Sequence, residues 1–220
     1  MPEAGPGRTV RLVLRAEHLL WFAGFLCLGI AGTAILESHF YQATENAAFD
    51  RALALPGDGG DRPVAGPGGS EAPASHSAAP PGVDSEVLGR IEIPRLGVRA
   101  IIREGVDDRT LGIAVGHIPG TARPGEPGNI GLAGHRDTFF RALRDVRKGD
   151  VLRLTTLSGS ETYCVASLSV VEPERTDVLS PTAGGIVTLV TCFPFDWIGS
   201  APKRFVVAAV AAGSPQRGGR

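Results

Sequence analysis

The second half of the sequence predicts an all-β fold, either a barrel or a sandwich. Seven segments within about 125 residues have the composition of strands. Residues 151–155 alternate between apolar and polar side chains, and residues 186–191 form a β-branched run. Short strands at this density are typical of barrels and sandwiches. The seven segments are residues 90–93, 98–102, 129–133, 151–155, 161–171, 186–191 and 204–211.

The segments between these strands predict turns and short helices. The run Pro94-Arg-Leu-Gly97 is typical of a turn. Residues 107–113 and 138–143 are each expected to form a short helix, and residues 177–179 at most one helical turn. The folded domain is therefore expected to occupy residues 87–212, with residues 213–220 as a frayed tail.

The N-terminal region predicts a membrane anchor. Residues 19–36 are 18 residues without a charge, close to the roughly 20 that a helix needs to cross a bilayer. Arginines precede this run and Glu37 follows it, so the positive-inside rule places residues 1–18 in the cytoplasm and the rest outside. A cleaved signal peptide is the main alternative, but its apolar region usually spans only about 7–15 residues. A buried helix of a soluble protein is the third.

A helix and a linker are expected to connect this anchor to the β-domain. Residues 37–55 continue with helical spacing of apolar side chains, which predicts a membrane-proximal helix. In residues 56–82, 13 of 27 residues are Gly or Pro, so residues 56–86 are predicted to be a linker. As a coil it would reach on the order of 30 Å and hold the domain off a membrane. Because few contacts should cross such a linker, a fragment beginning near Val83 is expected to fold alone.

Charge and cysteine content exclude several classes of protein. The formal net charge is −1, which gives no indication of nucleic-acid binding. The three cysteines, at positions 27, 164 and 192, form neither a disulfide framework nor a Cys-x-x-Cys pair. Cys164 lies in mid-strand and is expected to pack in the core, with a disulfide to Cys192 as the alternative. Cys27 lies in the apolar run and is expected to be inert.

The residues with the clearest chemical potential lie where strands end. The run 186–191 ends in Cys192, and after an 11-residue loop Arg204 opens the next strand. His135 follows the strand at residues 129–133. A cysteine thiolate can attack an amide carbonyl, a histidine can give the leaving amine a proton, and a guanidinium can hold an oxyanion. If the two strands pair antiparallel, Cys192 and Arg204 lie at one end of the sheet.

Together these segments resemble the sortases, membrane-anchored cysteine transpeptidases. Thr188-Leu-Val-Thr-Cys192 is similar to their cysteine signature, Leu132-Ala-Gly-His-Arg-Asp-Thr-Phe-Phe140 to their histidine segment, and Pro202-Lys-Arg-Phe-Val-Val207 to their arginine strand. Val115-Gly-His-Ile-Pro-Gly-Thr121 and Gly199-Ser-Ala-Pro-Lys-Arg204 are most similar to class D. The resemblance covers about residues 89–211.

The resemblance implies a closed sortase-type β-barrel of about eight strands with short helices, preceded by the transmembrane helix. It implies a catalytic site of Cys192, His135 and Arg204. The cysteine would cleave a Leu-Pro-x-Thr-type sorting signal after the threonine and form a thioacyl enzyme. An amine acceptor of the cell envelope or of a pilin would then release the product. The expected partners are thus the sorting-signal peptide, this amine and, through the N-terminal helix, membrane lipid.

Several neighbours of the three catalytic candidates are candidates for substrate binding. They are His117, Thr191, Asp137, Phe193 and Trp197. His117 is expected in a turn, and it is the alternative to His135 as the catalytic acid. Asp137 could orient His135 or cap the short helix that follows. A zinc site from His117, His135 and Cys192 lacks the usual ligand spacing, so neither a metal nor a cofactor is expected.

Two functional hypotheses of different kinds fit this pattern. The first is a cysteine transpeptidase at the cell envelope. The second is a membrane-tethered, non-catalytic β-domain that binds peptides. The presence of all three catalytic candidates favours the enzyme. An L,D-transpeptidase would also use cysteine and histidine, but its Ser-His-Gly-Cys signature is absent.

Overall fold

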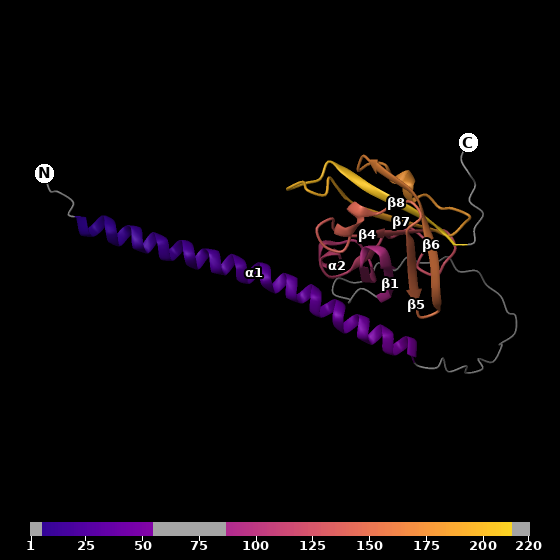
Figure 1. Cartoon of the computed structure of the whole chain (residues 1–220), viewed down its shortest axis with the longest axis horizontal. Helices are drawn as coiled ribbons and strands as arrows, with labels where there is room; N and C mark the ends of the chain where they lie inside the picture. Colours follow the sequence, from indigo (N-terminus) through magenta and orange to yellow (C-terminus); the bar gives the residue numbers. More distant parts are fainter. Residues whose placement is uncertain (1–5, 55–86, 213–220) are drawn as a thin grey trace, which may run out of the picture.

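The folded domain is a closed barrel of eight strands, which confirms the predicted all-β architecture. A computed structural model describes residues 6–54 and 87–212. Around the barrel the order is β1-β2-β3-β4-β7-β8-β6-β5. Figure 1 shows the barrel with most of its strands labelled. The strands are β1 (Val87–Ile93), β2 (Val98–Glu104), β3 (Val115–His117), β4 (Asn129–Ala133), β5 (Val151–Thr156), β6 (Gly159–Val171), β7 (Ile186–Phe193) and β8 (Lys203–Ala211).

Strand β3 is the one the sequence did not predict, and it corrects the placement of His117. That residue was expected in a turn but ends a three-residue buried strand between β2 and β4. A three-residue strand is too short to show a period-2 pattern. Gly116 within it is also needed for packing, since a Cβ there would lie 2.3 Å from the carbonyl oxygen of Gly105. Glycine is also common in turns, and Gly116 therefore led to the prediction of a turn at His117.

Apolar side chains from all eight strands fill the barrel. Fully buried members include Ile91, Leu132 and Leu189, and each such side chain stabilises the fold by roughly 1.5–3 kcal/mol through burial. Strand β6 corrects one prediction, because Tyr163 and Val165 point into this core and Cys164 between them does not. The alternation of side chains along a strand places Cys164 on the outer face, partly exposed.

Four short helical segments join the strands. Helix α2 (Asp108–Ile113) matches the predicted one, and the backbone N–H of Thr110 donates to the Asp107 side chain that caps it, at 3.0 Å. The others are 3-10 turns: η1 (Pro94–Leu96), η2 (Arg141–Asp145) and η3 (Thr176–Leu179). The helix expected at residues 138–143 is therefore shifted toward the C-terminus.

The N-terminal region forms one long helix, α1 (Pro6–Ala54), whose first half projects beyond the barrel (Figure 1). Residues 19–36 lie within it, and large apolar side chains such as Leu20, Phe22 and Phe25 are exposed. Within the described part of the chain, no helix combines the length and the apolar character that crossing a bilayer requires. The predicted transmembrane span is thus not confirmed. The predicted linker and tail lie outside the described residues.

The last part of α1 is not separate from the β-domain but packs against β1, β2 and α2. The Gln42 side chain bridges two segments of the domain: its Nε2 donates to the carbonyl of Ile113 at 2.7 Å, and its Oε1 accepts from the N–H of Ile101 at 3.0 Å. The Tyr41 hydroxyl accepts from Arg103 at 2.7 Å. The expectation that few contacts would connect the helix to the domain is therefore wrong.

A charged cluster reinforces this contact near the end of the helix. Asp50 accepts from Arg90 at 2.6 Å and from Arg99 at 3.0 Å, and the Arg90 guanidinium lies over the buried ring of Phe49. The hydrogen bond from Arg90 lowers the pKa of Asp50 from its ordinary value. A lowered pKa in the folded state means that this pair stabilises docking above about pH 4 and is lost as the pH falls further.

Replacing Gln42 by alanine is expected to loosen the helix from the barrel. The variant leaves a backbone N–H on β2 and a carbonyl at the end of α2 without their partner, which costs about 1–2 kcal/mol in the free energy of unfolding. Urea unfolding of the full chain measures it. Thr44→Ala is the matched control, because the Thr44 hydroxyl bonds only to carbonyls of its own helix. Equal stability of the two variants would contradict the docking contact.

Candidate active site

The register of β7 and β8 places Cys192 and Arg204 directly opposite each other. The two strands are antiparallel, and these residues form the last pair but one at that end. Directly opposed residues share a face of the sheet, with Cβ atoms about 5 Å apart. The sequence-based expectation that both lie at one end of the sheet is confirmed.

His135 lies level with Cys192 and Arg204, so that the three residues form one row across the ends of their strands, because β4 runs parallel to β7. Ala133 pairs with Val190, so the chain two residues further on, at His135, is level with Cys192. Parallel strands end at the same edge, which is why residues 57 positions apart in sequence meet here. Two hydrogen bonds extend the pairing beyond β4: Gly134 N–H to the carbonyl of Val190 at 3.2 Å, and the Thr191 hydroxyl to the carbonyl of Gly134 at 2.7 Å.

A cavity of about 330 Å³ opens at this row and contains all three catalytic candidates. Cys192 is a free thiol and is partly exposed. The Arg204 Nη1 donates to the carbonyls of Ala201 and Lys203, at 3.2 and 3.0 Å. No other side-chain hydrogen bond of Arg204 is found among the described residues, so most of its donors are available. The lining residues are His135, Arg136, Asp137, Cys192, Gly199, Ser200, Ala201 and Arg204.

Arg136 is a residue of this cavity that the sequence analysis missed. Its guanidinium donates to the carbonyl of Pro194 at 3.1 Å and to that of Gly199 at 2.8 Å. It thereby ties the loop between β7 and β8 to the segment that carries His135. The signal available in the sequence was its position directly after His135, but the two carbonyls it holds lie 58 and 63 residues away.

Arg136 is expected to act as a positioning residue. Arg136→Ala should lower kcat/KM about tenfold or more, since small displacements of catalytic groups are costly. Arg136→Lys should recover only part of this, because an ammonium lacks the planar fork that spans two carbonyls. Steady-state kinetics and urea unfolding are measured together. A loss of activity that merely follows a loss of stability would contradict the positioning role.

Of the five predicted substrate-binding residues, Asp137 alone lines this cavity. Its carboxylate makes neither expected contact: no hydrogen bond to His135 is present in the described part of the chain, and η2 has no side-chain cap. Thr191 is buried and holds Gly134. Phe193 packs with Phe195 and Phe205, at ring-centroid distances of 6.0 and 6.2 Å.

The remaining two predicted residues, Trp197 and His117, do not line this cavity. Trp197 is in the loop between β7 and β8, half exposed, and its Nε1 donates to the carbonyl of Ser200 at 3.0 Å. His117 is 2% exposed. Its Nδ1 lies 3.0 Å from a Glu104 carboxylate oxygen and its Nε2 lies 3.0 Å from the carbonyl oxygen of Ala122. These contacts hold β2, β3 and the following loop together, and His117 does not reach Cys192's cavity.

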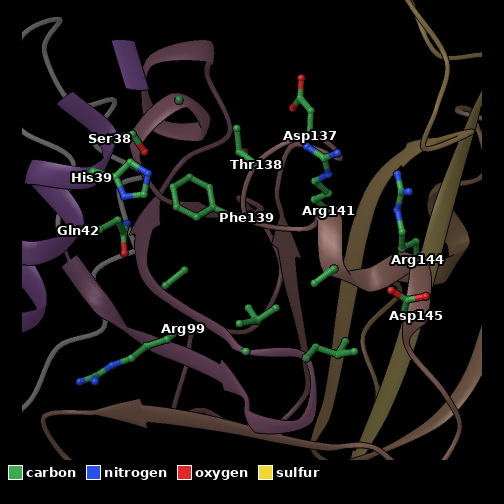
Figure 2. A pocket seen from close by; sticks show the side chains of 16 residues that line it. Ser38, His39, Gln42, Arg99, Asp137, Thr138, Phe139, Arg141, Arg144 and Asp145 are labelled. Carbon is green, nitrogen blue, oxygen red and sulfur yellow. The ribbon is translucent and has the colours of Figure 1, made fainter. Parts of the chain in front are cut away.

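A second and larger cavity, of about 830 Å³, lies between α1 and the barrel (Figure 2). Asp137 lines both cavities. Over the described residues, no group of three or more His, Cys, Asp or Glu side chains is arranged to hold a metal ion. The site therefore consists of a thiol, an imidazole and a guanidinium, with the larger cavity beside them.

Comparison with known proteins matches the same part of the chain. The family model described as "Sortase domain" matches residues 91–212. Sortase D of Bacillus subtilis is 37% identical over 123 residues, which cover 56% of this chain and 62% of that protein. Sortase SrtE1 of Streptomyces coelicolor is 35% identical over 124 residues, covering 47% and 35%. The chain thus matches about three fifths or less of the length of these two relatives.

Two solved sortase structures also match this chain, each over 60% of its length. The Clostridium perfringens Sortase D5 transpeptidase superposes with a TM-score of 0.54 at 31% identity, covering 60% of this chain and 82% of that one. Sortase C-1 from Actinomyces oris gives a TM-score of 0.54 at 36% identity, covering 60% and 76%.

Proposed function

Because the chain belongs to the sortase family, with its likeness to class D, we propose that it is a cysteine transpeptidase of the cell envelope. It would cleave a Leu-Pro-x-Thr-type sorting signal after the threonine and transfer the new carboxyl end to an amine. The observation that carries this proposal is the row of His135, Cys192 and Arg204, which the register of three neighbouring strands brings into one cavity.

In the first half-reaction the Cys192 thiolate attacks the threonine carbonyl carbon. The carbonyl oxygen becomes an oxyanion, and Arg204, opposite Cys192, is in position to hold it. The C–N bond of the peptide then breaks while His135 gives its proton to the departing amine. The product is a thioester between Cys192 and the threonine, with His135 neutral.

In the second half-reaction the acceptor amine attacks this thioester. The acceptor's ammonium first loses one proton to water, which balances the proton that the departing amine of the first half-reaction takes up from water, and its neutral nitrogen then attacks. As the new C–N bond forms, this nitrogen gives a second proton to the neutral His135, the base that the cavity offers, while the C–S bond breaks and Cys192 leaves as a thiolate. The enzyme returns to its starting protonation state, so no cofactor or further reactant is needed.

The same proposal includes attachment to the cell membrane through α1, with the barrel outside and the N-terminus in the cytoplasm. What supports it is the uncharged run at residues 19–36, the exposed apolar side chains along it and the arginines before it. Fractionation of cells that express the chain with and without residues 19–36 tests this part separately. Recovery of both forms in the soluble fraction would contradict it.

Mass spectrometry of the full chain with a Leu-Pro-x-Thr peptide tests the activity. The expected result is an adduct on Cys192 with the mass of the peptide up to threonine, which disappears when an amine is added. A transferred peptide–amine product should appear at the same time. Binding of the peptide without cleavage would instead support the non-catalytic peptide-binding hypothesis.

A further inference from the structure

The loop between β7 and β8 carries an apolar pair that the reaction described so far does not use. Trp197 is 51% exposed, and Ile198 next to it is 97% exposed. We propose that these two side chains contact the surface of the membrane that holds α1, so that the cavity of Cys192 lies at the bilayer surface. The inference rests on the proposed function, because it needs the proposed attachment of α1 to a membrane.

The path of α1 brings its exposed apolar side chains to the end of the barrel that carries this loop. The last turns of the helix contact β1 through Asp50, and Gln42, two turns earlier, contacts β2 and the end of α2. One turn earlier still, His39 lines the larger cavity together with Phe139 (Figure 2). The helix therefore runs from β1 over β2 to the segment that follows His135, and its apolar half leaves the barrel there.

The loop that carries the pair is held at the same end of the barrel. Arg136 donates to the carbonyls of Pro194 and Gly199, on either side of the pair, at 3.1 and 2.8 Å. Arg144 pairs with Asp196 of the same loop at 2.9 Å. In Figure 1 this loop is the part of the barrel that extends furthest toward the side on which the first half of α1 lies. The contacts and the view thus agree on the end at which the pair lies.

The spacing along α1 places this end next to the bilayer. Residue 36 ends the uncharged run and precedes His39 by three residues, so about 5 Å separate them along the helix axis. The headgroup layer on each side of the hydrocarbon core is roughly 5–8 Å thick. Because the barrel lies against the helix as early as His39, its end meets this layer.

The chemistry of the pair suits the headgroup layer. Tryptophan is enriched at membrane interfaces, where an apolar ring with one polar group is at its most stable. The Nε1 of Trp197 already donates to the carbonyl of Ser200 at 3.0 Å, so the ring can leave water without losing a partner for its N–H. The isoleucine beside it is uncharged and contributes apolar surface that is almost completely exposed in the absence of lipid.

An exposed apolar residue elsewhere on the barrel provides the matched control position. Leu157 is exposed and lies in the tight turn between β5 and β6. Figure 1 shows this turn near the C-terminal end of α1, away from the half of the helix that projects beyond the barrel. Leu157 is therefore not expected to reach the membrane.

Tryptophan fluorescence of the full chain in phosphatidylcholine vesicles tests the contact. The chain has two tryptophans, so Trp21→Phe leaves Trp197, and Trp197→Phe leaves Trp21 in the apolar run of α1. We expect Trp197 to lose fluorescence when the lipid chains carry bromine near the headgroup, as Trp21 does, and to emit at a shorter wavelength than an indole in water. Leu157→Trp, in a chain that also carries Trp21→Phe and Trp197→Phe, should show neither effect.

Substitution of Ile198 tests whether the pair makes the contact. In the Trp21→Phe chain, Ile198→Asp should weaken the quenching of Trp197 by brominated lipid, because a carboxylate is costly to remove from water. Ile198→Leu should keep the quenching. The side chain is almost fully exposed, so neither change disturbs the core. Equal quenching in the two variants would contradict a contact made by this pair.

The remaining outcomes separate the loop contact from the proposed function. Quenching of Trp21 but not of Trp197 would overturn the inference, because the helix would then be in the membrane and the loop would not. A shorter emission wavelength of Trp197 without quenching by lipid would also overturn it, since protein would then cover the pair. Quenching of neither tryptophan would contradict the attachment of α1 itself and, with it, the inference.

Discussion

Replacing Cys192 by alanine is expected to abolish formation of the thioester and with it transpeptidation. Removing the nucleophile of an acyl-transfer enzyme costs on the order of 10⁴–10⁶ in kcat. The cavity offers no equivalent nucleophile, because its lining contains no other cysteine, and its one hydroxyl group, on Ser200, belongs to the loop between β7 and β8 and not to a strand end. The measurement is cleavage of a Leu-Pro-x-Thr peptide together with mass spectrometry of the protein.

Cys164→Ala is the matched control and should retain most of the activity. Cys164 pairs with Val210 on β8, six residues from the partner of Cys192, so the two sulfurs lie at opposite ends of that strand, about 20 Å apart. The same separation excludes the disulfide that the sequence left open, and both thiols are free. Comparable loss in the two variants, with both proteins folded, would contradict the assignment of Cys192.

The parts of the site that could be predicted from the sequence are those that sit on a single strand–loop–strand unit. Cys192 and Arg204 end and begin adjacent β-branched runs, and a hairpin brings such residues together through local chain direction alone. The position of His135 could not be predicted from local sequence in this way. It depends on β4 running parallel to β7, which only the resemblance to sortases implied and no local pattern could show.

The contacts that the sequence analysis missed all join distant segments. Gln42 reaches residues 59 and 71 positions away, and Arg136 reaches across more than 50. Polar side chains of this kind look like ordinary solvent-facing residues until the fold is known. Strand β3 was missed because of its length, since three residues are too few to show the alternation of apolar and polar side chains that identifies a strand. The cavity beside α1 could not be predicted either, because one of its walls is the docked helix.

Docking of α1 also brings the N-terminal region close to the candidate active site. A helix joined to the domain only by a linker would affect its location and not its chemistry. Here the helix contacts β1, β2 and α2 through Tyr41, Gln42 and Asp50, and it forms one wall of the cavity next to Asp137. Any fragment that begins after the helix therefore lacks part of that cavity and exposes Arg90 and Arg103.

The Arg204→Ala variant is expected to lose about 10²–10³ in kcat with a smaller change in KM. In the proposed reaction, charge develops beside Arg204 only when the threonine carbonyl becomes tetrahedral. An interaction made mainly in the transition state lowers kcat when it is removed. Loss of one oxyanion donor costs roughly 3–4 kcal/mol. The position of Arg204 fits this, because it is opposite Cys192 and the two carbonyls that hold its Nη1 leave its other donors available.

The conservative variant and the two kinetic constants distinguish this role from substrate binding. Arg204→Lys keeps the charge and loses the planar fork, so it should recover only part of the rate. If Arg204 instead held the sorting peptide in the ground state, Arg204→Ala would raise KM and leave kcat unchanged. Lys203→Ala is the control for charge in general, because Lys203 is exposed and forms a surface ion pair with Glu172 at 3.1 Å. Because such surface ion pairs contribute little, Lys203→Ala should change kcat less than about twofold. A loss of kcat equal to that of Arg204→Ala would mean that positive charge alone matters, and it would contradict the role of Arg204 as a positioned oxyanion donor.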